Sequence, residues 1–110
     1  MNWIPLQTEE QLDEIISNSS ESPKVIFKHS TRCSISSMAK NRLDKSDKPE
    51  GIDFYYLDLL SHRNISNKIA SVFHVPHQSP QVLVIKNGKS VYDESHSGIR
   101  MDDIEEQINK

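Results

Sequence analysis

The sequence changes its periodicity within one stretch, Val25-Ile26-Phe27-Lys28-His29-Ser30-Thr31-Arg32-Cys33-Ser34-Ile35-Ser36. It begins with a run of β-branched and aromatic residues, which is typical of a strand buried on both faces. The apolar residues that follow recur at helical spacing. They predict a helix whose buried face carries Ile35, Met38, Ala39 and Leu43. Cys33 therefore lies where a strand ends and a helix begins.

Periodicity and turn signals extend the pattern in both directions. Asn87-Gly88 is a strong signal for a two-residue hairpin, and Thr8 with Gln11 has the spacing of a capping box. Ser61 is the predicted cap of a further helix. The predicted elements, in order, are helix 8–18, strand 25–27, helix 35–43, strand 52–60, a helix carrying Ile65, Ile69, Val72 and Phe73, strands 81–85 and 90–95, and a helix carrying Met101, Ile104 and Ile108.

This order of elements indicates the fold class. A strand–helix–strand unit makes its two strands parallel, and the hairpin adds antiparallel strands. The expected architecture is α/β, a central mixed β-sheet flanked by helices on both faces, in a single domain over residues 1–110. Such an arrangement resembles the thioredoxin-like fold.

The composition limits the class of protein. The chain has 110 residues, with one cysteine, three glycines and five prolines, which excludes a disulfide scaffold, a collagen-like chain and a low-complexity chain. Its 13 basic and 16 acidic residues give a formal charge of −3, so we expect neither nucleic acid nor a membrane as a partner. No apolar run could span a bilayer, and the N-terminus lacks the features of a signal peptide. We therefore expect a cytoplasmic protein.

Cys33 is the predicted catalytic residue. In a reducing cytosol a lone cysteine stays a thiol, and only the thiolate is a nucleophile. The first N–H groups of a helix and its dipole favour negative charge nearby, Arg32 could add a positive charge, and Ser36 could donate a hydrogen bond to the sulfur. The alternative is an inert cysteine buried as a small apolar side chain. The polar neighbours of Cys33 favour the reactive thiol.

A second feature is Ser79-Pro80, directly before a predicted buried strand. Proline has no N–H for a β-ladder, so an ordinary trans proline at the start of a strand explains the spacing. A cis bond would turn the chain sharply and leave the backbone of Ser79 free to pair with an extended partner. The turn at Ser95-His96-Ser97-Gly98 should lie near this loop. His96 and Gly98 then either line a substrate groove or belong to a solvated loop.

Several motifs together resemble one family. Ser79-Pro80 and the strand and Asn87-Gly88 turn that follow are similar to the cis-proline segment of thioredoxin-like proteins, and Cys33-Ser34-Ile35-Ser36 falls where that superfamily keeps C-x-x-C or C-x-x-S. The more specific resemblance is to the monothiol bacilliredoxins, the YtxJ-like family. It rests on four segments in the same order, His29 to Ser36, Tyr55-Tyr56-Leu57, His77 to Gln81 and Ser95-His96-Ser97, and covers roughly residues 25–99.

The resemblance implies a reaction. Monothiol bacilliredoxins remove bacillithiol from protein mixed disulfides, so Cys33 would attack the bacillithiol sulfur and carry it until a second thiol releases it. Ser36 stands in the place of a resolving cysteine, so no internal disulfide can form. Many family members have proline where this chain has Ser34, which puts the transfer of quantitative redox properties in doubt. The expected substrate-binding residues are Thr31, Arg32, Ser34, Ser36, Ser79, Pro80, His96 and Gly98.

The expected partners are bacillithiolated proteins, bacillithiol itself and a recycling reductase, with no cofactor. The five histidines and one cysteine form no recognisable set of ligands, so we expect no metal. Two alternatives stay open. One is a monothiol glutaredoxin-like or thioredoxin-like reductase that acts on glutathione or another thiol substrate. The other is a thioredoxin-like adaptor without catalysis, in which Cys33 is buried.

Overall fold

The computed structural model describes residues 1–110. It contains five strands, four α-helices and one short 3-10 helix. In chain order these are β1 (Trp3–Pro5), α1 (Glu9–Asn18), β2 (Lys24–His29), α2 (Ser34–Asp44), β3 (Asp53–Asp58), α3 (Arg63–Phe73), β4 (Gln81–Lys86), β5 (Lys89–Ser95), η1 (His96–Gly98) and α4 (Met101–Ile108). None of the α-helices combines the length and the apolar character that crossing a bilayer requires.

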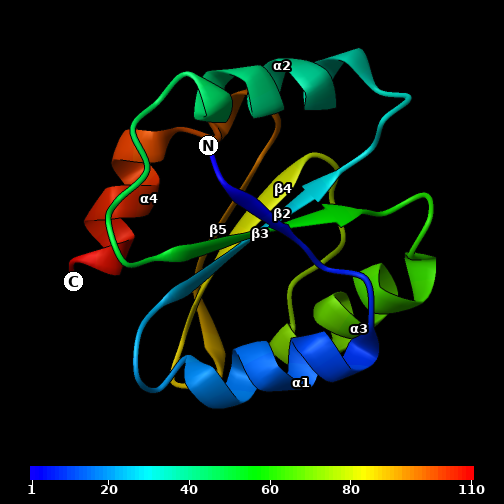
Figure 1. Ribbon diagram of the computed structural model, residues 1–110. Helices are drawn as coiled ribbons and strands as arrows, with labels where there is room; N and C mark the ends of the chain where they lie inside the picture. The colour runs from blue at the N-terminus through cyan, green and yellow to red at the C-terminus, as the bar shows by residue number, and fades with distance from the viewer.

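The strands form one mixed sheet in the order β1-β3-β2-β4-β5. β3 runs parallel to both β1 and β2, whereas β4 is antiparallel to β2 and β5. Figure 1 shows α2 and α4 on one face of this sheet and α1 and α3 on the other. The predicted mixed sheet with helices on both faces is confirmed.

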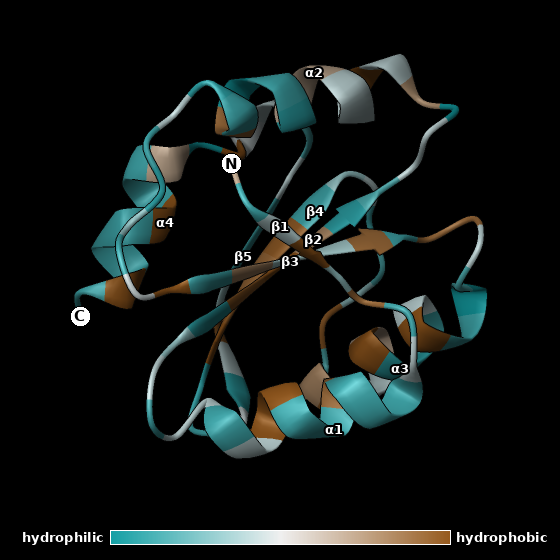
Figure 2. Ribbon diagram, viewed as in Figure 1, coloured by the Kyte–Doolittle hydropathy of each residue, from teal (hydrophilic) through white to brown (hydrophobic).

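Two apolar clusters fill the spaces between the sheet and its helices, and β2 and β4 contribute to both. Ile26 and Leu83 belong to the cluster beneath α1 and α3, whereas Phe27 and Val82 belong to the cluster beneath α2 and α4. All six residues of β2 are buried, as predicted for a strand covered on both faces. In Figure 2 the hydrophobic colour is concentrated in these central strands and on the helix sides that face them.

Two predicted local signals are confirmed, one at the start of a helix and one at a hairpin turn. Thr8 caps α1, accepting a hydrogen bond from the backbone of Gln11 while the Gln11 side chain reaches back. Asn87 and Gly88 both have positive φ, at 52° and 76°, as a tight turn between antiparallel strands requires.

The structure corrects two predictions outside the site. β1 was not predicted, because three residues that end in proline carry no alternation; pairing with β3 makes them a strand. The residue that caps α3 is His62 and not Ser61. The Ser61 hydroxyl instead donates to the carboxylate of Asp58, which lies at the end of the preceding strand.

Candidate functional site

Cys33 lies at the N-terminal end of α2. It is the N-cap residue, with extended backbone angles, and its side chain is partly exposed to solvent. The N–H of Cys33 donates to the carbonyl oxygen of Ser30, and its own carbonyl accepts from Ser37. The chain therefore leaves β2 through a short turn and presents the sulfur where the helix starts, as predicted.

The backbone at this helix end offers free donors. Ser34, Ile35 and Ser36 form the first turn of α2, and none of their N–H groups has an acceptor within the protein. Such groups carry the positive end of the helix dipole. No acidic residue stands in this turn to neutralise them. A thiolate at the N-cap position is thus favoured by the backbone itself.

Ser36 has a different role from the predicted one. Its hydroxyl lies 2.6 Å from Nδ1 of His29 and accepts a hydrogen bond from the N–H of Ser30, and the side chain is fully buried. The expected hydrogen bond to the Cys33 sulfur is absent. With the imidazole proton on Nε2, the single hydroxyl proton of Ser36 goes to His29. Ser36 therefore fixes the first turn of α2 on β2.

His29 is a site residue that no sequence pattern indicated. It is buried beside Phe27 and Tyr56, with ring centroids 5.8 and 5.5 Å away. Burial lowers the pKa of its imidazole, and the nearby charge of Lys40 lowers it further. The neutral ring is therefore favoured, and it joins the end of β2 to the helix that carries the thiol. Its position four residues before Cys33 was the only available signal.

The apolar face predicted for α2 is wrong in its first two turns. Ile35 and Met38 are exposed, at 50% and 61%, and the buried residues of the helix are Ser36, Ala39 and Leu43. The helix is rotated so that small and polar residues face the sheet near its start. Two apolar side chains consequently lie on the solvent side of the helix end that carries Cys33.

The Ser79–Pro80 peptide bond is cis. Pro80 is buried and leads directly into β4, whose first residue pairs with Lys28 of β2. Because β2 and β4 are antiparallel neighbours, the start of β4 and the end of β2 meet at one edge of the sheet. The proline loop and the turn to Cys33 thus leave the same edge.

The turn that contains His96 lies beside the proline loop, as predicted. The N–H of His96 donates to the carbonyl oxygen of Pro80 at 3.1 Å. His96 has a positive φ of 56° and its side chain is exposed. Gly98 is partly buried against the side chain of Glu94, and an added Cβ would meet that carboxyl carbon at 2.6 Å.

The remaining predicted contact residues are on the surface. Thr31 and Arg32 form the turn before Cys33, Ser34 follows it, and all three are exposed without side-chain hydrogen bonds. Their backbone surrounds the cysteine. No group of three or more His, Cys, Asp or Glu side chains is arranged to hold a metal ion.

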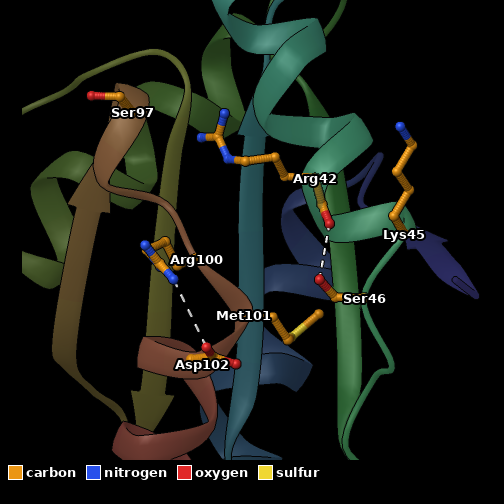
Figure 3. Close-up of a pocket in the computed structure, with 7 residues that line it drawn as sticks. All are labelled: Arg42, Lys45, Ser46, Ser97, Arg100, Met101 and Asp102. Carbon is orange, nitrogen blue, oxygen red and sulfur yellow. Dashed lines mark hydrogen bonds and ion pairs between the residues drawn. The ribbon is translucent and has the colours of Figure 1, made fainter.

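A cavity of about 490 Å³ lies near the far end of α2. Figure 3 shows Arg42 reaching from α2 toward η1, with Arg100 and Asp102 on the opposite wall. The guanidinium of Arg42 donates to the carbonyl oxygens of His96 and Ile99. This cavity contains none of the predicted site residues. Arg42, however, fixes the turn at His96, which contacts Pro80.

Comparison with known proteins agrees with this geometry. A solved structure described as a provisional oxidoreductase with a thioredoxin fold has a TM-score of 0.82 and 30% identity, over 94% of this chain and 91% of that one. Thioredoxin from Trypanosoma brucei brucei has a TM-score of 0.77 at 14% identity, covering 98% of this chain and 88% of its own. Malassezia sympodialis thioredoxin has a TM-score of 0.75 at 18% identity, covering 98% and 89%.

The family follows from a direct match. The model of the monothiol bacilliredoxin BrxC family matches residues 4–104, which include Cys33, the proline loop and the turn at His96. The structural neighbours place that match on the thioredoxin fold. The chain therefore belongs to the monothiol bacilliredoxin family, has the thioredoxin fold, and functions in thiol redox chemistry.

Proposed function

We propose that this protein is a thiol-disulfide oxidoreductase that removes bacillithiol from protein mixed disulfides through Cys33. The observation that carries the proposal is the position of the only cysteine. Cys33 caps α2 with its side chain partly exposed, in a chain of the monothiol bacilliredoxin family. The adaptor alternative required a buried sulfur, so this exposure supports the catalytic one.

The reaction uses two exchanges. The Cys33 thiolate attacks the bacillithiol sulfur of the mixed disulfide, a new disulfide forms between Cys33 and bacillithiol, and the target protein leaves as a thiolate that takes a proton from water. A second bacillithiol thiolate then attacks the bacillithiol sulfur on Cys33. This step releases oxidised bacillithiol and restores the Cys33 thiolate. A separate reductase would recycle the oxidised bacillithiol.

The surrounding backbone supports each exchange. The unpaired N–H groups of Ser34 and Ile35 favour the thiolate before attack and after release. The backbone of Ser79 makes no hydrogen bond within the protein and is available to an extended substrate, and Thr31, Arg32, His96 and Gly98 are further contacts in this proposal. Since Ser36 replaces a resolving thiol, the disulfide on Cys33 must be opened by a second molecule.

Mass spectrometry tests the proposal. The protein is mixed with a model protein that carries bacillithiol, and intact masses are followed with time. We expect an adduct of bacillithiol mass on Cys33, loss of the same mass from the model protein, and neither change in the Cys33→Ser variant. Parallel reactions with the glutathionylated model protein compare substrates. Faster exchange with glutathione would overturn the bacillithiol assignment, and no exchange with either would overturn the catalytic one.

A further inference from the structure

Three buried side-chain atoms have no hydrogen-bond partner within the protein, and all three lie at one place. They are Nζ of Lys28, Oγ of Ser79 and Oε1 of Gln81. Lys28 and Gln81 are direct partners across β2 and β4, so their side chains project from the same face of the sheet. Ser79 precedes Gln81 by two residues, across the cis bond at Pro80. Every unsatisfied buried side-chain atom of the chain thus belongs to the base of the proline loop.

The three atoms have complementary chemistry. An ammonium group has three donors and no acceptor, an amide oxygen accepts, and a hydroxyl does both. A buried ammonium without a partner is costly, and buried polar groups of this kind are usually satisfied by protein atoms or by ordered water. A water site needs between two and four polar partners. Lys28, Ser79 and Gln81 supply three.

No carboxylate compensates the charge of Lys28. Its side chain is fully buried and forms no ion pair. Desolvation lowers the pKa of Lys28 to about 8, so the ammonium form still predominates at neutral pH. The titratable groups that face Lys28 on this side are His77 and Arg63. Burial lowers the pKa of His77, and the charges of Lys28 and Arg63 lower it further. Asp58 lies in β3, opposite His29 rather than Lys28.

The loop already has two other attachments. The side-chain amide of Gln81 donates to the carbonyl oxygen of Pro76, and the carbonyl oxygen of Pro80 accepts from His96. These bonds hold the two ends of the loop, whereas the hydroxyl of Ser79 in its middle is bonded to nothing in the protein. The buried ammonium of Lys28, opposite Gln81 in the sheet, is a donor that also lacks a partner.

We propose that Lys28 is a positioning residue for the Ser79–Pro80 loop, because its ammonium holds the Ser79 hydroxyl and the Gln81 amide oxygen through ordered water. The loop is then fixed in the shape in which the backbone of Ser79 meets an extended mixed disulfide, a step that rests on the proposed function. Lys28 does not touch the reacting sulfur atoms. It acts through Ser79.

An NMR titration tests the link without any substrate. The Cys33→Ser variant serves as the background, so that the thiol contributes no titration. We expect the side-chain carbons of Lys28, the backbone amide of Ser79 and the side-chain amide of Gln81 to shift together, with a common midpoint near the pKa of Lys28. In Lys28→Met the shifts of Ser79 and Gln81 at this midpoint should disappear. The proposal would be overturned if the chemical shifts of Ser79 and Gln81 did not change with the protonation of Lys28.

Kinetics supply the second readout, in the protein that retains Cys33. Lys28→Met is expected to raise KM for a protein mixed disulfide about tenfold, the effect of losing one charge-assisted hydrogen bond. The alkylation rate of Cys33 should not change. The matched control is Lys24→Met on the same strand, which removes the ion pair with Asp53 at the other end and should leave KM unchanged. Equal KM values for wild type and Lys28→Met would contradict the role of Lys28.

The two tests separate this inference from the proposed function. If the protein exchanges no bacillithiol, the NMR titration still decides whether Lys28 holds the loop. Lys28→Arg adds a further check because arginine keeps its charge at every accessible pH. In Lys28→Arg the affinity for the mixed-disulfide substrate should be retained at alkaline pH. In the wild type this affinity should weaken as Lys28 loses its proton.

Discussion

The hydroxyl of Ser36 lies 2.6 Å from Nδ1 of His29 in the interior of the protein, between the end of β2 and the start of α2. The same hydroxyl accepts the N–H of Ser30. One side chain therefore satisfies two groups of the strand end and fixes the helix turn that follows Cys33. Ser36 is therefore a packing element that joins the start of α2 to the end of β2.

Replacing Ser36 by alanine should destabilise the protein. The substitution leaves the imidazole of His29 and the N–H of Ser30 without a partner in a buried place, which costs about 1–3 kcal/mol. Urea denaturation measures this loss as a lower midpoint. Ser37→Ala on the exposed side of the same turn is the control and should change the midpoint little. Equal midpoints for the two variants would contradict the structural role of Ser36.

Stability should also fall in mild acid. Burial lowers the pKa values of both His29 and His77 below the ordinary value of 6.5. Between the lowered pKa values and 6.5 the unfolded chain therefore binds more protons than the folded one. The contribution of the two neutral imidazoles to the free energy of unfolding is complete above pH 6.5 and is lost as the pH falls through their folded pKa values. Thermal unfolding from about pH 7 to about pH 5.5 should show a decreasing Tm. In His77→Gln the decrease should be smaller, and a flat profile in the wild type would contradict the lowered pKa values of the two imidazoles.

Ser34→Pro should be tolerated and should weaken the thiolate. Ser34 is the first residue of α2, its N–H has no partner, and Cys33 before it has φ −108° and ψ 120°, which a following proline permits. We expect a stability gain of about 0.4–1 kcal/mol from the stiffer unfolded chain.

The same substitution removes one N–H donor near the sulfur. Alkylation of Cys33 at neutral pH should therefore be slower in Ser34→Pro than in Ser34→Ala, which keeps the N–H. Equal alkylation rates in these two variants would show that this N–H does not act on the thiolate.

Arg42 should contribute to stability although it is exposed. Its guanidinium donates to the carbonyl oxygens of His96 and Ile99, and Arg42→Ala should cost about 1 kcal/mol because these bonds are lost. Arg100→Ala in the same cavity is the control, since its 4.0 Å pair with Asp102 is on the surface and contributes almost nothing. Chemical denaturation of both variants compares them directly. A smaller loss in Arg42→Ala than in Arg100→Ala would contradict this assignment.

Lys28→Met should make the protein more stable. The folded pKa of Lys28, about 8, is below the ordinary value of 10.5, so protonation favours the unfolded chain until the pH rises through both values. Removing the buried charge should gain about 3 kcal/mol at neutral pH. In the wild type, but not in Lys28→Met, the free energy of unfolding should increase between about pH 8 and about pH 10. Lower stability of the variant would contradict the uncompensated charge.

Sequence patterns predicted the elements with clear periodicity or clear turn residues. β2, β4 and the turn at Asn87-Gly88 are examples, because a β-branched run favours a buried strand and an Asn-Gly pair favours a tight hairpin turn. β1 was missed because a three-residue strand is created by its neighbour β3 and not by its own residues. Ile35 and Met38 were misplaced for the opposite reason, since hydrophobicity alone assigns apolar residues to the core.

The position of Cys33 could be predicted because a strand-to-helix junction is visible locally. The cis bond at Pro80 was suggested only by resemblance to a family, since the spacing fits a trans proline as well. The burial of Lys28 and His29 could not be predicted from the sequence. A charged residue near the end of a strand is normally exposed, and only the packing of helices on both faces of β2 encloses these two side chains.

The single thiol per chain has a kinetic consequence. Because Cys33 is the only cysteine, each disulfide that this protein makes joins it to another molecule, so every bond-forming step is second order and depends on the concentration of the partner. The chain cannot hold an internal disulfide between one reaction and the next. Air oxidation of the purified protein without small thiols should therefore produce covalent dimers on a non-reducing gel, and an excess of any accessible small thiol should suppress them.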